Sequence, residues 1–303
     1  KLMSIKKIKV IAEAACNHNG NLRTAYKLVD QAVIAKADVV KFQIYDVDQL
    51  VTKNAKKANY AKKNTKKNQS QYEMQKKLQL TQNEHYKLKK YCEKKGIEYL
   101  SSAFDIPSLS FLKKINIKQI KIPSGEITNY PYLKFVGSLN KKTILSTGMS
   151  TLNEIRKALN VLKRSGLKKN KITLLQCNTE YPTPFTAVNL KAMIALKKKF
   201  NLEVGLSDHT LGIEVPIAAA ALGAKIIEKH FTLNRKLSGP DHKSSLLPQE
   251  LKKMVSSIRN IEKAIGKSQK TITKSELKNR KIARKSIVPV KKIKKNEIFK
   301  LSN

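Results

Sequence analysis

The side chains with the most direct chemistry stand at the ends of short apolar runs. His209 ends the run VGLSDH two residues after Ser207, and His230 ends IIEKH two residues after Glu228. Residues two apart in a strand share a face, so each histidine would lie beside a second polar group. Two imidazoles from neighbouring strands can bind one divalent ion and leave positions open for water and substrate. The spacing therefore predicts a metal site at His209 and His230.

Two lysines stand inside apolar runs and predict an anion site. Lys41 is flanked by Val40 and Phe42, and Lys121 lies within a similar run. A buried ammonium group is costly unless an anion accompanies it. Ammonium and hydroxyl groups are the donors that phosphate and carboxylate oxygens accept. We expect Lys41 and Lys121 to anchor such an anion together with hydroxyl groups at the ends of other runs, namely Ser102, Ser124, Ser146, Thr179 and Ser207.

The elements that must position these residues alternate regularly between strand and helix patterns. Apolar, β-rich runs occur at 10–16, 38–45, 97–104, 119–125, 143–149, 172–178, 203–209 and 225–232. Amphipathic segments separate them; two begin with capping boxes at Thr81 and Thr151, and two stop at Gly96 and Gly166. Eight such units predict an α/β fold of the (β/α)8 TIM-barrel type. No GxGxxG or GxxxxGK[ST] motif follows the first strand, which disfavours a nucleotide-binding open sheet.

Polar residues occur at or just after every predicted strand. Glu13 lies in the first strand, Asn17 and His18 follow it, and Gln43 shares a face with Lys41 in the second. A (β/α)8 barrel keeps its chemistry at the carboxyl ends of its strands, so we expect these side chains to converge there. Two further candidates follow the fourth and sixth strands, namely Glu126 and Tyr181.

Three other features yield structural expectations. Asp208 alternates to the face opposite His209, so it is expected to orient a neighbour rather than bind the metal. His85 lies in the predicted helix that begins at Thr81, away from the strand ends, and is expected at the surface. Residues 46–80 form a long polar insert after the second strand, which we interpret as a flap over the barrel mouth.

The composition limits the possible partners. The chain has 62 Lys and Arg against 22 Asp and Glu, a formal charge of +40, which is typical of proteins with anionic partners. These charges are dispersed along nearly the whole chain, which favours the interpretation that most of them are solvated surface charges. Because aromatic content is only 6%, a basic nucleic-acid-binding protein is the weaker interpretation. Three cysteines without CxxC spacing indicate no disulfide framework. No run of eighteen apolar residues and no signal-peptide core is present, so we expect a cytoplasmic protein without a membrane partner.

Eight motifs, in order and in register with the eight strands, resemble the sialic acid synthase family. They are EAACNHNG (13–20), VKFQ (40–43), KIPSGEITNYPYL (121–133), ILSTGM (144–149), CNTEYPTP (177–184), GLSDHTLGIE (205–214), EKHFT (228–232) and GPDHKSS (239–245). The resemblance implies a transferase that condenses phosphoenolpyruvate with an N-acetylmannosamine-type sugar. Its products would be a nine-carbon 2-keto acid, N-acetylneuraminate, and phosphate. The alternative within the family is an N,N'-diacetyllegionaminate or pseudaminate synthase acting on a diacetamido-trideoxyhexose.

The resemblance also implies roles for individual residues. His209 and His230 would bind Mn or Mg, and Glu13 and Glu126 would be catalytic. Phosphoenolpyruvate would lie against Lys41, Gln43, Ser102, Lys121, Ser124, Ser146, Thr179 and Ser207. The sugar side would include Asn17, His18, Tyr181 and Asp241. Two stretches depart from the family pattern, because the family commonly has Ser-Thr-Pro-Phe at 101–104 and His-Cys-Thr at 176–178.

The domain organisation follows from the same resemblance. We expect a synthase barrel over 1–268, a linker over 269–283, and at 284–303 the opening strands of an antifreeze-like domain. In the family this domain reaches into a partner's barrel and supplies an arginine, which implies a homodimer. Either the sequence is a fragment or the enzyme lacks that arginine. A barrel that has lost activity and serves as a binding module is a further alternative, disfavoured by the complete lysine and histidine set.

Overall fold

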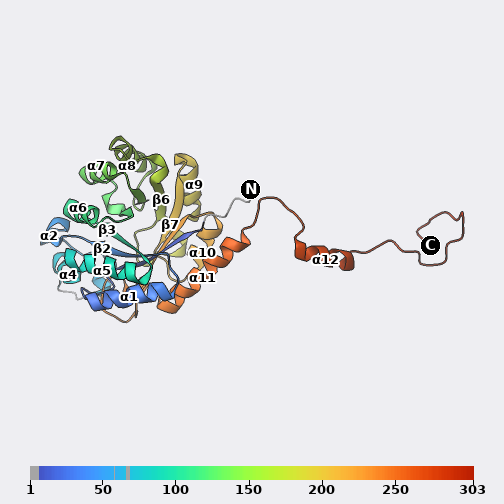
Figure 1. Cartoon of the computed structure of the whole chain (residues 1–303), viewed down its shortest axis with the longest axis horizontal. Coiled ribbons are helices and arrows are strands. Elements are labelled where there is room, and N and C mark those ends of the chain that lie inside the picture. The colour runs from blue at the N-terminus through green and yellow to red at the C-terminus, as the bar shows by residue number, and fades with distance from the viewer. Residues whose placement is uncertain (1–6, 58, 66–68) are drawn as a thin grey trace. The chain divides into compact units, whose positions relative to one another are not determined.

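The computed structural model describes residues 7–57, 59–65 and 69–303, and in them eight parallel strands close into a barrel in chain order (Figure 1). The predicted (β/α)8 fold is confirmed. The strands are β1 (Lys9–Ala15), β2 (Val39–Ile44), β3 (Glu98–Ala103), β4 (Gln119–Ile122), β5 (Lys142–Ser146), β6 (Ile172–Cys177), β7 (Glu203–Asp208) and β8 (Ile226–His230).

Two strands end three residues earlier than the sequence patterns predict. β4 ends before Pro123, which has no amide hydrogen to donate to a neighbouring strand, and a 3-10 turn follows at Ser124–Glu126. β5 ends before Met149, whose positive φ of 57° no strand residue adopts. After both strands, the chain therefore turns across the barrel mouth earlier than the apolar runs predict.

Helices cover the outside of the barrel. They are α1 (Leu22–Ile34), α5 (Gln82–Lys95), α6 (Ile106–Lys114), α7 (Tyr130–Leu139), α8 (Leu152–Arg164), α9 (Leu190–Phe200), α10 (Glu214–Ala221) and α11 (Pro248–Ala264). The capping boxes predicted at Thr81 and Thr151 start α5 and α8, and Gly96 closes α5 with a φ of 71°. α5 and α8 thus begin where side chains satisfy free backbone groups of the first turn.

The barrel interior is arranged in layers. Its lower layer is an apolar cluster in which six strands each contribute one buried residue: Ile11, Val39, Leu100, Ile144, Leu175 and Ile226. Two residues further along each of these strands, the next inward position carries a polar group: Glu13, Lys41, Ser102, Ser146, Cys177 and Glu228. Because side chains alternate with a period of two, a hydrocarbon layer supports a polar layer at the carboxyl ends.

The insert after β2 is more ordered than a polar flap. It contains α2 (Val47–Leu50), α3 (Asn59–Asn64) and α4 (Gln71–Leu78), and a Ser70–Glu73 capping box starts α4. Met74 and Leu78, four residues apart, share one helix face and pack with Ala61 and Cys16. The lysine-rich composition conceals this short apolar face, so the sequence pattern predicts a long loop where the structure has helices.

Asp208 lies on the outer face of β7, as its alternation predicts. It forms an ion pair with Lys229 of β8, which is fully buried and also donates to the backbone carbonyl of Thr210. Lys229 alternates with Glu228 and His230, so β8 carries one buried charge behind the barrel and two polar groups inside it.

The prediction that His85 lies at the surface is wrong. His85, Leu88 and Cys92 follow i, i+3, i+7 spacing on α5 and form its buried face. The imidazole Nδ1 lies 2.8 Å from the hydroxyl oxygen of Tyr99, which gives the buried ring a polar partner. Burial, with a smaller contribution from His18, lowers the pKa of His85 to about 3.

Because His85 is buried, we expect the stability of the folded protein to fall as the pH is lowered. Its folded pKa of about 3 lies below the ordinary value of 6.5, so the unfolded chain takes up the proton first as the pH falls. Because of His85, the free energy of unfolding should therefore fall by about 2 kcal/mol when the pH is lowered from 7 to 5. A His85→Phe variant, measured by urea denaturation at both values, is expected to lose that much less than the parent. Equal losses would contradict the assignment.

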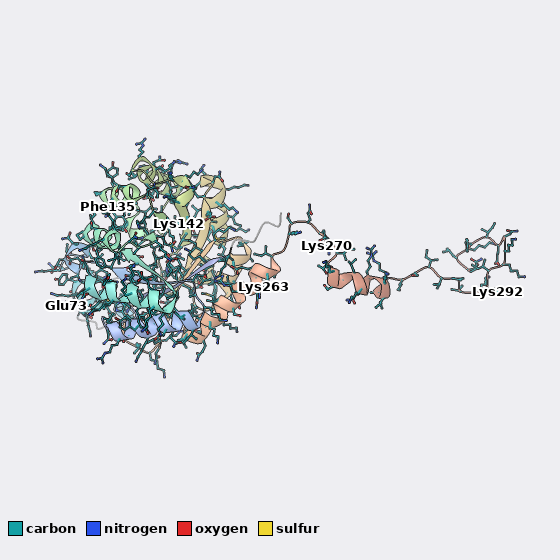
Figure 2. All side chains as sticks on the ribbon, in the orientation of Figure 1. Glu73, Phe135, Lys142, Lys263, Lys270 and Lys292 are labelled. Carbon is teal, nitrogen blue, oxygen red and sulfur yellow. The ribbon has the colours of Figure 1, made fainter. Side chains whose placement is uncertain are left out.

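Most lysines project from the surface, including Lys142 and Lys263 (Figure 2). Such charges are solvated where they stand, which agrees with the interpretation of the basic composition as surface charge. In the described part of the chain, none of the helices has the length and apolar character needed to cross a membrane.

Residues 266–303 form a separate compact unit. It contains α12 (Lys274–Ala283), started by a Thr273–Glu276 capping box, and a hydrogen bond from the Val290 amide to the Asn303 carbonyl at 2.9 Å. Its boundary falls three residues before the predicted one at 268/269. Residues 284–303 are described without a strand, and their relation to an antifreeze-like domain stays a prediction.

Candidate active site

A cavity of about 240 Å³ opens at the carboxyl ends of the strands, and all eight strands contribute to its lining. Thirteen of the sixteen residues with a predicted catalytic, binding or metal-ligand role line this cavity. They are Glu13, Lys41, Gln43, Ser102, Lys121, Ser124, Ser146, Thr179, Tyr181, Ser207, His209, His230 and Asp241.

One end of the cavity contains a buried network of charges held together by Glu228. Its Oε1 accepts from Lys121 Nζ at 3.1 Å and from Ser207 Oγ at 2.8 Å, while its Oε2 lies 3.2 Å from Lys41 Nζ. Lys41 Nζ also lies 3.0 Å from Glu13 Oε2 and donates to Ser102 Oγ at 3.1 Å. The carboxyl groups that contact the buried lysines therefore come from β1 and β8.

The ionisable groups of this network differ in the direction of their pKa shifts. Burial alone would raise the pKa of Glu228, but Lys121 and Lys41 outweigh it and hold that pKa below the usual range. Burial raises the pKa of Glu13 to about 8 against the attraction of Lys41. Burial would lower the pKa of Lys41, yet Glu13 and Glu228 raise it, whereas the pKa of Lys121 stays lowered by burial. At neutral pH Glu228 is ionised and Lys41 is cationic, and the raised pKa of Glu13 allows its carboxyl group to exchange a proton.

One buried hydroxyl in this part of the cavity has no protein partner. Ser146 Oγ is inaccessible to solvent and makes no hydrogen bond within the described structure. A buried hydroxyl without a partner is costly, so a ligand atom is the natural acceptor here. Ser146, Lys41 and Lys121 together form an end of the cavity suited to a phosphate or carboxylate group.

The two histidines form the other chemical group of the cavity. Their ring centroids lie 5.3 Å apart, and the ring of Tyr181 packs 4.1 Å from that of His209. His209 Nδ1 faces the backbone carbonyl of Asn178, which can only accept, so the proton resides on Nδ1 and the Nε2 lone pair is free. His230 Nδ1 is buried without a hydrogen bond, 3.9 Å from Asp241 Oδ2.

Both imidazoles are in the form that binds metals. Burial lowers the pKa of His209 to about 4 and that of His230 well below 6.5, so both rings are neutral at physiological pH. Within the described ranges no group of three or more His, Cys, Asp and Glu side chains is arranged to hold an ion. The pair thus fits a divalent ion with two protein nitrogens and open positions for oxygen ligands.

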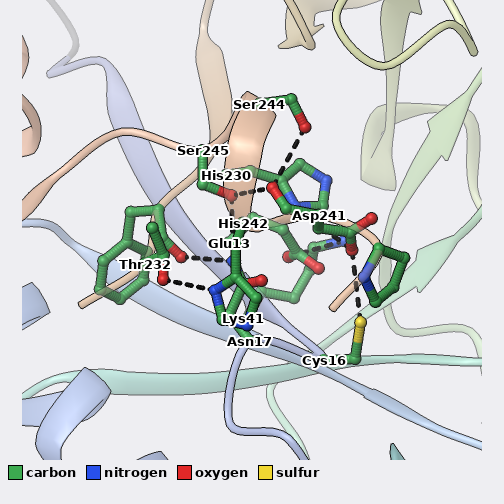
Figure 3. A network of polar contacts seen from close by, with 12 residues as sticks. Glu13, Cys16, Asn17, Lys41, His230, Thr232, Asp241, His242, Ser244 and Ser245 are labelled. Carbon is green, nitrogen blue, oxygen red and sulfur yellow. Dashed lines mark hydrogen bonds and ion pairs between the residues drawn. The ribbon is translucent and has the colours of Figure 1, made fainter. Parts of the chain in front are cut away.

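Asp241 is held beside His230 by a tightly bonded loop after β8. Its backbone carbonyl accepts from Ser244 Oγ at 3.1 Å and Ser245 Oγ at 2.7 Å, and the Cys16 thiol lies 3.4 Å from its Oδ2 (Figure 3). Burial raises the pKa of Asp241 to about 6. The loop therefore fixes a readily protonated carboxylate at the edge of the cavity.

Three predicted site residues lie outside the cavity lining. Asn17 Nδ2 donates to the carbonyl of Phe231 at 2.8 Å and to Ser245 Oγ at 3.0 Å, so it ties β1 to the loop after β8 (Figure 3). His18 is buried and accepts from the amide of Gly20. Glu126 accepts from Asn129 at 2.7 Å, and burial raises its pKa. The sugar-binding roles of Asn17 and His18 and the catalytic role of Glu126 stay predictions.

Several residues that line the cavity have no predicted site role, including Cys16, Cys177, Glu228, Met74 and Gln75. Glu228 has a detectable signal, because it lies two residues before His230 on the same face. Cys177 has a weaker one, since it ends β6, and its sulfur lies 3.2 Å from Ser124 Oγ. Met74 and Gln75 come from the insert, and no local pattern predicts that this segment reaches the cavity.

Comparisons with known proteins agree with this geometry. Residues 28–270 match the model of the NeuB family. The chain is 53% identical over 299 residues to the N,N'-diacetyllegionaminic acid synthase of Campylobacter jejuni, covering 99% of this chain and 90% of that protein. The enzyme of the same name from Legionella pneumophila is 45% identical, covering 92% and 79%. The N-acetylneuraminic acid synthetase of Leptospira borgpetersenii, solved with citrate, superposes with a TM-score of 0.79 at 33% identity, covering 92% of each chain.

Proposed function

Because this chain belongs to the NeuB family, we propose that it condenses phosphoenolpyruvate with an N-acetylmannosamine-type sugar and releases phosphate. The family resemblance inferred from the motifs is confirmed, and the chain is a sialic acid synthase-type enzyme. The observation that carries the proposal is one cavity with a lysine and hydroxyl end and a neutral histidine pair.

Phosphoenolpyruvate would occupy the anion end. Its phosphate and carboxylate oxygens need several donors, and Lys41, Lys121 and the free hydroxyl of Ser146 supply them from three strands. Gln43, Ser124 and Thr179 lie in the same lining. Glu228 would keep both ammonium groups aimed inward, since it contacts each of them.

His209 and His230 would hold a divalent ion, Mn or Mg. Bound there, the ion would act as a Lewis acid on the aldehyde of the open-chain sugar. The protein's own contribution is to hold both rings neutral and to fix the His209 ring through the carbonyl of Asn178. Tyr181 packs against both rings and restricts their movement.

The reaction forms a bond between C3 of phosphoenolpyruvate and the aldehyde carbon, which becomes a hydroxyl-bearing carbon. Water adds at C2, the bond between C2 and the phosphate oxygen breaks, and the 2-keto acid and phosphate result. We assign the proton of this water to Glu13, because a pKa of about 8 allows it to exchange a proton near neutral pH. Glu126 stays a candidate for contact with the sugar hydroxyls.

A diacetamido-trideoxyhexose is the second candidate acceptor. The 53% identity to the C. jejuni N,N'-diacetyllegionaminic acid synthase over nearly the whole chain favours it. We further propose that the enzyme acts as a homodimer in the cytoplasm, as the family resemblance implies.

The direct test is to incubate the protein with phosphoenolpyruvate, Mn and one sugar at a time: N-acetylmannosamine, its 6-phosphate, or the diacetamido-trideoxyhexose. Phosphate release that depends on the sugar is expected with at least one of them. Phosphoenolpyruvate labelled with ¹⁸O in the bridging position should deliver the label to phosphate. Absence of sugar-dependent phosphate release with all three acceptors would contradict the proposed function.

A further inference from the structure

The wall of the cavity beyond Asp241 is built by the insert that follows β2. Asp241 Oδ2 lies 3.9 Å from His230 Nδ1 on one side and 3.4 Å from Cys16 Sγ on the other. Cys16 belongs to the same apolar cluster as Met74 of α4, and Met74 and Gln75 line the cavity. A molecule with its aldehyde at the histidines that extends past Asp241 therefore ends against Met74 and Gln75.

This far wall carries no positive charge among the described residues. The cavity lining contains two lysines, Lys41 and Lys121, and both are bound to Glu228 at the opposite end. The chain has 62 Lys and Arg in all, so their absence from the lining at the far wall is not a consequence of composition. Burial raises the pKa of the Cys16 thiol well above its ordinary value, so it is uncharged. A phosphate placed here would lie near Asp241 without a counter-charge.

The wall is fixed in position by contacts on both sides. The hydroxyl of Tyr45, just after β2, donates to the backbone carbonyl of Gln75 at 3.0 Å. Asn64 of α3 donates to the carbonyl of Pro240 at 3.0 Å, next to Asp241. Met74 is 4% exposed, and behind it lies a second cavity of about 410 Å³ that Lys77 lines. Met74 thus separates the catalytic cavity from a second space that contains a lysine.

We propose that Met74 and Gln75 determine acceptor specificity. The thioether of Met74 selects a sugar whose far end carries methyl groups, and the neutral amide of Gln75 leaves a 6-phosphate without a counter-charge. Thioether sulfur and methylene groups pack well on methyl groups and gain nothing from a hydroxyl. This inference rests on the proposed function, because it requires the aldehyde to lie at the histidine pair.

The test compares kcat/KM for the diacetamido-trideoxyhexose, N-acetylmannosamine and its 6-phosphate. The parent enzyme is expected to prefer the first over the second by about 10-fold, the effect of one altered group in an apolar pocket. The 6-phosphate is expected to be poorer still. Met74→Gln, which keeps the length of the side chain, should bring the ratio of kcat/KM for the diacetamido-trideoxyhexose to kcat/KM for N-acetylmannosamine close to one. The apolar control Met74→Leu should retain the parent ratio.

Gln75→Lys places a positive charge on the far wall at a partly exposed position. It therefore tests whether the lack of a cation there excludes the 6-phosphate, even if a Met74 variant fails to fold. It should raise kcat/KM for the 6-phosphate by about 10-fold and leave the KM for phosphoenolpyruvate unchanged. A parent enzyme that prefers the 6-phosphate, or variants that leave all ratios unaltered, would overturn the inference. Failure of the proposed function is distinct, since then no acceptor yields phosphate.

Discussion

Replacing His209 with alanine is expected to lower kcat/KM for condensation by about 1,000-fold and to remove tight binding of Mn. A bound ion contributes several kcal/mol to stabilising the negative charge that develops on the aldehyde oxygen, and each 1.4 kcal/mol corresponds to a factor of ten. His209 has a free Nε2, while its Nδ1 is committed to the carbonyl of Asn178. Steady-state kinetics with added Mn and isothermal titration of Mn into the protein measure the two effects separately.

The matched control removes a histidine outside the cavity. His85→Phe takes away a buried imidazole that contacts Tyr99, so it should leave Mn affinity and kcat/KM as in the parent. Undiminished turnover or undiminished Mn binding in His209→Ala would refute the assignment of the metal ligands.

The Lys41→Met substitution is expected to raise the KM for phosphoenolpyruvate by about 100-fold and to change the KM for the sugar much less. Truncating one partner of a buried, hydrogen-bonded charge pair costs about 3 kcal/mol of binding free energy, which corresponds to that factor. Lys41 lies at the anion end of the cavity, where it contacts Glu13, Glu228 and Ser102. Initial rates with each substrate varied in turn provide both constants.

Lys229→Met separates binding from folding. Lys229 is also a buried strand lysine with a carboxylate partner, but it faces Asp208 behind the barrel. Breaking either buried pair should cost about 3 to 5 kcal/mol of unfolding free energy, so both variants should be destabilised. Only Lys41→Met should alter the KM for phosphoenolpyruvate; equal rises in both KM values of that variant would argue against the placement of the substrate.

The fold could be predicted from the sequence because its signals are local. Apolar runs, capping boxes such as Thr81–Glu84 and a closing glycine at 96 each depend on a few adjacent residues. The same locality explains why twelve of the thirteen predicted site residues that line the cavity meet there, since strand alternation and the carboxyl-end rule place them without knowledge of tertiary contacts. Asp241, the thirteenth, lies in the loop after β8 and is predicted from the family resemblance alone.

The remaining features depend on contacts between distant segments. Glu228 contacts both lysines because β8 closes the barrel against β1, and no stretch near Glu228 contains that information. The burial of His85 depends on Tyr99 lying opposite α5. Met74 reaches the cavity because Cys16 offers an apolar surface for α4. Each of these requires knowing which elements pack together.

The layered interior has a consequence for how such an enzyme can change. Along six strands one step of two residues, about 7 Å, separates an apolar side chain from a polar one. Substitutions in the lower layer, for example at Val39, should alter abundance and melting temperature while the surviving molecules keep their substrate preference. Substitutions at Lys41, one step above, should alter chemistry. Related enzymes could therefore acquire another reaction through substitutions in the upper, polar layer while the lower, apolar layer stays unchanged.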